Sequence, residues 1–158
     1  MTGQGASGDY RIVVGVDGSP GSVLALEWAV REAGQRGATA HAVMAWEHPQ
    51  PYAANVWGLG MDPALDIQEA LASAAAAEAA RIAGEVGEAQ DMVVTSAAFE
   101  GHPATALLQA AQDADLLVVG SRGHGGFVGA LLGSVSQHVV CHASCPVVVV
   151  PDADRHHS

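Results

Sequence analysis

Residues 116–134 read LLVVGSRGHGGFVGALLGS, an apolar run that passes directly into a glycine-rich stretch. A short run this apolar and this rich in valine is typical of a strand covered on both faces. Glycines after such a strand let the backbone approach a ligand closely, and Gly133-Ser134 is expected to begin a helix. The N–H groups and the positive dipole end of a helix start favour a phosphate. The stretch therefore predicts backbone anion binding; the alternative is a plain surface loop in which Ser134 only caps the helix.

Other short apolar runs share the character of residues 116–119, and longer stretches with helical periodicity separate them; the runs are 12–16, 40–46, 92–97 and 147–150. This alternation predicts right-handed crossovers and a single-domain, doubly wound α/β fold, with a five-stranded parallel sheet and helices on both faces. Ligands in such sheets bind outside the carboxyl ends of the strands, where the strand order reverses. The glycine-rich stretch leaves a strand at that end.

Four helices are expected between these strands. Ser19 and Pro20 predict the start of the first helix, and Gly34 and Gly37 supply its end. A long Ala-rich helix follows, a third begins at Pro103, and a fourth begins near Gly133 and ends before Pro146. Their core-facing positions are predicted to be Leu71, Ala75, Ile82 and Val86 in the second, Ala104, Leu107, Leu108 and Ala111 in the third, and Val135, Val139 and Val140 in the fourth.

The charge of the chain limits its partners. Asp and Glu number 17 against 6 Lys and Arg, which gives a formal net charge of −11. A surface this acidic repels phosphate backbones and anionic lipids, so we expect no nucleic-acid partner and no membrane association. All six basic residues are arginines. Without lysine there is no P-loop lysine, no kinase strand lysine and no Schiff-base chemistry.

The remaining composition indicates a cytoplasmic protein with one domain. The 158 residues suit a single core, which must be built from Val, Leu, Ile and Ala because aromatic residues make up only 4%. Two cysteines and the absence of an apolar leader or membrane span favour a reducing compartment. We expect a disordered segment at 1–9, the domain at 10–151 and a flexible tail at 152–158. The Pro- and Gly-rich segment 47–63 is expected to be a mobile connection or, alternatively, a lid or partner-binding loop.

The glycine spacing is not a Walker A motif, and Val128 breaks a G-x-G-x-x-G register. The glycine spacing resembles the ATP-binding pattern of the universal stress protein family: Gly120, two residues, Gly123, nine residues and then Gly133-Ser134. The resemblance extends from Arg11 to Pro151. It includes the turn Asp17-Gly18-Ser19 and the ending Cys145-Pro146 before the last valine run.

The resemblance implies a sheet of order 3-2-1-4-5, of the adenine nucleotide alpha hydrolase-like type, with ATP, with or without Mg²⁺, across the gap between the first and fourth strands. It also implies a homodimer through the last strand, Val147 to Val150, which as a sheet edge invites pairing. Asp17 would meet the adenosine moiety, although an Asx turn or a helix cap is its alternative role. The implied nucleotide-binding residues are Gly15, Val16, Asp17, Ala45, Val119, Gly120, Arg122, Gly123, Gly133, Ser134, Val135 and Ser136.

A metal site and a catalytic site are not expected. His138, Cys141, His142 and Cys145 share one helical face, which is compatible with zinc, but Cys145 stands directly before Pro146, where a helix ends. No nucleophile–base–acid set can be assembled.

Three functions follow as hypotheses. The first is an ATP-binding, nucleotide-responsive regulatory module in stress response. The second is a slow ATPase or autophosphorylating protein, and the third is a nucleotide-independent interaction scaffold. The sequence leaves open ATP against ADP or a cyclic nucleotide, because backbone donors discriminate poorly among phosphates.

Overall fold

The computed structural model describes residues 10–47, 63–123 and 131–152. Strands and helices alternate along the described chain. The order is β1 (Arg11–Gly15), α1 (Pro20–Arg36), β2 (Thr39–Trp46), α2 (Pro63–Ala89), β3 (Val94–Glu100), α3 (Pro103–Ala110), β4 (Leu116–Gly120), α4 (Ser134–His142) and β5 (Val147–Val150).

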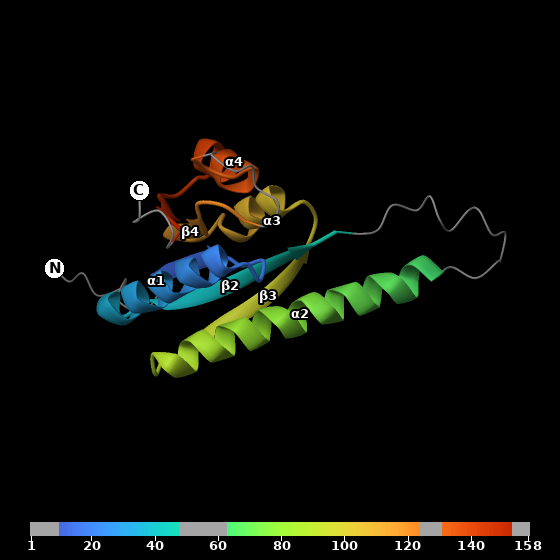
Figure 1. The fold of residues 1–158 in the computed structure, drawn as a ribbon, viewed down its shortest axis with the longest axis horizontal. Coiled ribbons are helices and arrows are strands. Elements are labelled where there is room, and N and C mark those ends of the chain that lie inside the picture. Colours follow the sequence, from blue (N-terminus) through green and yellow to red (C-terminus); the bar gives the residue numbers. More distant parts are fainter. Residues whose placement is uncertain (1–9, 48–62, 124–130, 153–158) are drawn as a thin grey trace.

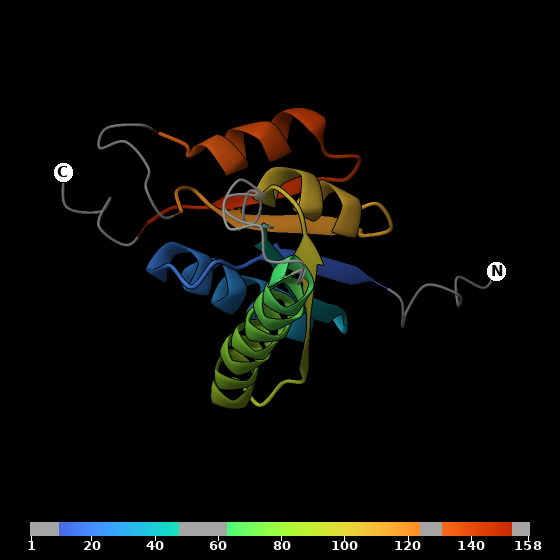
Figure 2. The same ribbon diagram turned by 90° about the vertical axis from the view of Figure 1, so that its right-hand side faces the viewer.

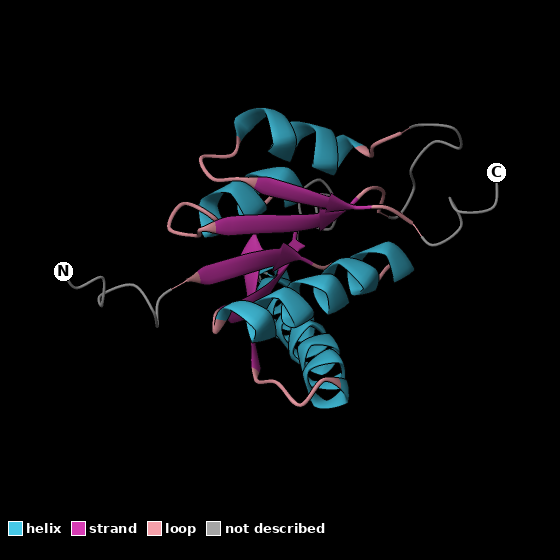
Figure 3. Ribbon diagram, turned by 90° about the vertical axis from the view of Figure 1, so that its left-hand side faces the viewer, coloured by secondary structure: helices cyan, strands magenta, loops and turns pink. Residues whose placement is uncertain are grey.

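The strands form one parallel five-stranded sheet in the order β3-β2-β1-β4-β5, which confirms the predicted fold class and strand order (Figure 3). β1 lies at the centre, where Val13 pairs with His41 of β2 and with Leu117 of β4. The chain leaves β1 in one direction to form β2 and β3 and in the other to form β4 and β5. The reversal of strand order therefore falls between β1 and β4, which is where ligands bind in sheets of this kind.

Helices cover both faces of the sheet. Figures 1 and 2 show α1 and α2 on one side of the strands and α3 and α4 on the other. Each side has its own core, because successive side chains of a strand point to opposite faces. Ile12 and Val14 pack with α1 and α2, whereas Val13 packs with α3 and α4. The buried apolar residues are Val, Leu, Ile and Ala with one methionine, Met44, as the low aromatic content predicts.

The ends of α1 follow from local chemistry. Ser19 is the N-cap and accepts a hydrogen bond from the Ser22 N–H, with Pro20 in the first turn. Gly37 ends the helix in the left-handed conformation, with φ 66°, where a Cβ would be strained. Gly34 was expected to share this role but lies inside the helix, because the i→i−4 ladder continues to Arg36.

Several predicted boundaries shift, and β3 also ends at Glu100, three residues beyond the expected strand at 92–97. α2 begins at Pro63, inside the segment expected to be irregular, and β3 begins at Val94 rather than at Met92. The turn between them is tight: Met92 N–H bonds to the Gly87 carbonyl at 2.8 Å, and Asp91 has a positive φ of 55°. Val140 was expected to face the core, but it is 47% exposed, while Val139 is buried.

Candidate functional site

A pocket opens where the carboxyl ends of β1 and β4 diverge. Its volume is about 330 Å³, within the range of small-molecule sites. Its walls come from the ends of β1, β2 and β4, the loop after β4, and the first turns of α1, α3 and α4. Every residue predicted for the ligand site lines this pocket: Gly15, Val16, Asp17, Ala45, Val119, Gly120, Arg122, Gly123, Gly133, Ser134, Val135 and Ser136. The structure thus brings the whole set together; their binding of a nucleotide stays a prediction.

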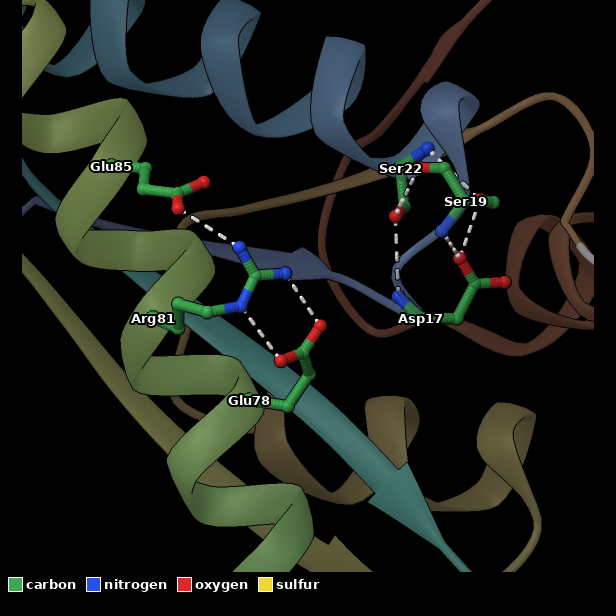
Figure 4. A network of polar contacts seen from close by, with 6 residues as sticks. All are labelled: Asp17, Ser19, Ser22, Glu78, Arg81 and Glu85. Carbon is green, nitrogen blue, oxygen red and sulfur yellow. Dashed lines mark hydrogen bonds and ion pairs between the residues drawn. The ribbon is translucent and has the colours of Figure 1, made fainter.

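Asp17 follows β1 and organises the turn into α1 (Figure 4). Its Oδ1 accepts hydrogen bonds from the backbone N–H of Ser19, at 2.9 Å, and from the Ser19 hydroxyl. Its own N–H donates to the buried Ser22 hydroxyl at 3.2 Å. The Asx-turn role considered from the sequence is therefore real. It does not displace the other role, because the exposed Asp17 also lines the pocket.

The glycine-rich loop passes close to its neighbours. A Cβ built on Gly123 would lie 2.5 Å from Oδ2 of Asp17, and one on Gly120 would lie 2.9 Å from the backbone carbonyl of Gly21 in α1. A side chain at either position would displace Asp17 or α1. Glycine at these two positions is thus explained by the close approach of the loop backbone to Asp17 and to α1. It also leaves this part of the pocket rim without side chains.

The start of α4 faces the pocket without a side-chain cap. Gly133 is the N-cap, and among the described residues no side chain caps its helix. Gly133, Ser134, Val135 and Ser136 all line the pocket, so the positive end of the helix dipole is directed there. The Ser136 hydroxyl donates to the Ser121 carbonyl at 2.9 Å. This bond fixes α4 against the loop and directs the Ser136 hydroxyl toward the protein backbone, although the resemblance implied that Ser136 binds the nucleotide.

Arg122 lines the pocket and is ion-paired. Its Nε and Nη2 lie 2.8 and 2.7 Å from Oδ2 of Asp152, the residue that follows Pro151 after β5. We expected Asp152 to begin a solvated tail, but its side chain is only 21% exposed. Residues 1–9 and 153–158, the other parts of the predicted disordered segment and tail, lie outside the described residues.

Sequence reasoning missed five residues that line the pocket: Ser19, Ser22, Val43, Pro103 and Leu107. Ser19, Ser22 and Pro103 lie in or just before the first turns of helices that follow β1 and β3, so strand order alone could have placed them. Leu107 was assigned to the core. It also fills the space beside Gly15, where a built Cβ would lie 2.7 Å from its Cδ1. Only the three-dimensional structure reveals that contact.

The other clusters considered from the sequence gain no support. His138 and His142 stack with ring centroids 4.4 Å apart. Cys145, however, lies beyond His142, the last residue of α4, and beyond its C-cap Ala143. Within the described ranges no group of three or more His, Cys, Asp or Glu side chains could hold a metal ion. Cys141 and Cys145 are free thiols, and burial and the charge of Asp115 raise the pKa of Cys145. Residues 48–62, which belong to the Pro- and Gly-rich segment, lie outside the described part of the chain.

Fold and pocket together define a doubly wound α/β domain with a ligand-sized cleft at its topological switch point. The profile of the universal stress protein family matches residues 10–151. The chain belongs to the universal stress protein family.

Individual relatives agree with this assignment. Universal stress protein Rv1996 of Mycobacterium tuberculosis is 40% identical over 141 residues, which cover 87% of this chain and 43% of that protein. The chain thus spans about half the length of the curated relatives it matches. Among the helices of the described ranges, none has both the length and the hydropathy of a membrane span.

Solved structures of the family share the fold. UspA from Lactobacillus plantarum superposes with a TM-score of 0.69 at 24% identity, over 89% of this chain and 97% of that one. A universal stress protein in complex with cAMP has a TM-score of 0.60 at 28% identity, over 89% and 95% of the two chains.

Proposed function

We propose that this protein binds ATP and acts as a nucleotide-responsive regulatory module in the stress response. One observation carries the proposal: a single pocket at the switch point collects the glycine loop, the Asp17 carboxylate and the uncapped start of α4. A helix start of this kind binds an anion through backbone N–H groups. Backbone donors matter here, because a chain with a net charge of −11 repels anions at long range.

Each part of the pocket suits a part of an adenine nucleotide. The phosphates would lie against the start of α4 and approach the loop closely at Gly123. The carboxylate of Asp17 would accept hydrogen bonds from ribose hydroxyls. Ala45, at the carboxyl end of β2, would contact adenine through its backbone, and Val43 and Leu107 would provide apolar walls.

The identity of the ligand is the finer part of the proposal. The family member solved with cAMP supports an adenine nucleotide as the class. We take ATP as the first candidate, with ADP and cyclic nucleotides as alternatives. Asp17 is the one carboxylate among the described residues that line the pocket. A bound Mg²⁺ would therefore be coordinated mainly by phosphate oxygens and water, as is usual for this ion.

The assembly and location of the protein are also proposals. β5 is an edge of the sheet, and all four of its valines are only partly buried. We infer that two copies pair along this edge. The two free thiols are compatible with a reducing compartment, and we place the protein in the cytoplasm.

Identification of the nucleotide that copurifies with the protein tests the proposed ligand class. Protein purified without added nucleotide is denatured by heat, and the released compounds are separated and identified by mass. We expect an adenine nucleotide in the released fraction. If the released fraction contains only a ligand without phosphate, the pocket serves another class of molecule and the proposal fails.

A further inference from the structure

The ion pair between Arg122 and Asp152 lies at the edge of the candidate site. Arg122 is the one cation among the described residues that line the pocket. Both of its contacting nitrogens reach the same oxygen, Oδ2 of Asp152, and the two side chains are 27% and 21% exposed. Because the pair is partly buried, water and salt screen it less than they screen an ion pair in open solvent.

Two other parts of the chain lie close to the segment that carries Asp152. The carbonyl of Val150, two residues earlier, accepts a hydrogen bond from the Ser121 N–H at 2.9 Å. A Cβ built on Gly21, in the first turn of α1, would lie 2.9 Å from Oδ1 of Asp152 and 3.0 Å from the Arg122 carbonyl. The end of β5, the loop after β4 and the start of α1 therefore meet at a point where a side chain at position 21 would not fit.

The pair changes the electrostatics of the pocket. The positive charge of Arg122 is offset by Asp152, and Asp17 adds a negative charge to the same pocket. A ligand with several phosphate charges is repelled by the carboxylates of Asp17 and Asp152 and by the net negative charge of the whole chain. The unfavourable interaction grows with the number of ligand charges. It is therefore larger for ATP than for cAMP.

We propose that Asp152 is a positioning residue that tunes the pocket against highly charged phosphates. It holds the Arg122 guanidinium at the rim and offsets its charge, which lowers the affinity for a nucleoside triphosphate relative to a cyclic monophosphate. This inference rests on the proposed nucleotide-binding function.

The test compares ATP and cAMP binding by calorimetry in wild type and Asp152→Asn, which keeps the size of the side chain and one oxygen acceptor. We expect ATP affinity to rise by about three- to tenfold and cAMP affinity to change by less than about twofold. Asp113→Asn is the matched control, because it removes an exposed carboxylate just before β4, at the opposite end of that strand. It should leave the ATP-to-cAMP ratio at the wild-type value.

A second comparison separates positioning from folding. In an Arg122→Gln background, Asp152→Asn still removes a negative charge but releases no guanidinium, so it should raise the ATP-to-cAMP affinity ratio by a smaller factor than in the wild-type background. A loss of local structure would alter the ratio equally in both backgrounds. An unchanged ratio in Asp152→Asn, or the same change with and without Arg122, would overturn the inference alone. Failure of the wild type to bind either nucleotide would overturn both the inference and the proposed function.

Discussion

At the scale of single residues, Asp17 combines a local and a ligand-facing position. Its Oδ1 accepts hydrogen bonds that organise the start of α1, and its Oδ2 lies close to the backbone of Gly123 across the pocket. Asp115 offers a matched comparison at the other end of the sheet. Its Oδ2 also accepts a backbone hydrogen bond, from Arg11 at 2.8 Å, but it is not a pocket residue.

We expect Asp17→Asn to weaken ATP binding by about tenfold or more, because a hydrogen bond to a charged group contributes about 1.5–3 kcal/mol. Asp115→Asn should leave ATP affinity within about twofold of wild type while it lowers the free energy of unfolding by about 1 kcal/mol. Calorimetry measures the first quantity and urea denaturation the second. Equal ATP affinity in Asp17→Asn and wild type would restrict Asp17 to its role in the turn.

The sequence predicted the residues of the pocket well where the backbone does the work. Gly120, Gly123 and Gly133 belong to the spacing that resembles the family's ATP-binding pattern, and their place between a buried strand and a helix start predicted a backbone binding site. Asp152 could not be predicted, because its partner Arg122 lies 30 residues earlier and nothing in the local pattern links a residue after the last strand to the loop after β4. Contacts of that kind depend on strand order and side-chain direction together.

At the scale of elements, α2 contains two glycines with opposite surroundings. A Cβ on Gly84 would meet nothing within 4 Å, whereas one on Gly87 would lie 2.5 Å from the backbone carbonyl of Met92. Exposed ion pairs of Arg81 with Glu78 and Glu85 lie on the same helix (Figure 4). Such exposed pairs stabilise a helix only slightly, so helix propensity and packing dominate.

Gly84→Ala should raise the free energy of unfolding by about 0.5–1 kcal/mol, because alanine loses less backbone entropy in a helix. Gly87→Ala should lower it by about 1–3 kcal/mol, because the new methyl group forces the turn before β3 to move. Urea denaturation of the two variants measures both changes. A gain in stability for Gly87→Ala would show that the turn yields freely.

His41 on β2 makes the stability of the folded protein depend on pH. Its Nδ1 lies 2.6 Å from the Thr95 hydroxyl of β3, and burial, followed by the charge of Arg11 on β1, lowers its pKa below the ordinary value. The folded state therefore favours the neutral imidazole, and the unfolded chain binds a proton more readily. The stability that this preference contributes is full above the unfolded pKa of about 6.5 and is lost as the pH falls through that value toward the lower folded pKa.

We expect wild type to lose more stability than His41→Gln when the pH falls from about 7.5 to about 5.5. The measurement is the urea midpoint at each pH. Parallel curves for His41→Gln and wild type would mean that another group sets the pH dependence.

Element identities were predictable because apolar runs and helical periodicity differ plainly along this chain. Several boundaries were not predictable, and the start of β3 shows the reason. Met92 and Val93 are apolar and suggest a strand, but Met92 N–H closes the turn onto Gly87, and Val93 is 87% exposed. The turn overrides the apolar composition there. The Met92 N–H forms its hydrogen bond within the turn, so it is not available to pair with a neighbouring strand.

At the scale of the whole molecule, the edge of the sheet decides the expected assembly. The carbonyls of Pro146 and Val150 accept hydrogen bonds from the β4 side, at Leu117 and Ser121. Because backbone groups alternate in direction along a strand, the N–H of Val149 is directed away from β4. A proline at position 149 would remove this donor without breaking the pairing with β4.

We expect wild type to sediment as a dimer and Val149→Pro as a monomer. Val149→Thr keeps the N–H and the side-chain shape, so it should remain dimeric. Sedimentation velocity measures the three species. A monomeric wild type would contradict the proposed pairing, and so would a dimeric Val149→Pro, because its contacts would then lie elsewhere.

ATP binding at the start of α4 is the central claim, and titration calorimetry with ATP and Mg²⁺ on wild type, Gly123→Val and Gly84→Ala tests it most directly. Gly123→Val places a side chain against Asp17 and into the path of the ligand, whereas Gly84→Ala adds a methyl group in open space. Circular dichroism first establishes that all three proteins are folded. We predict saturable binding for wild type and Gly84→Ala and at least about a tenfold loss of affinity for Gly123→Val. No heat of binding for wild type at millimolar ATP, or equal binding by Gly123→Val, would contradict the account.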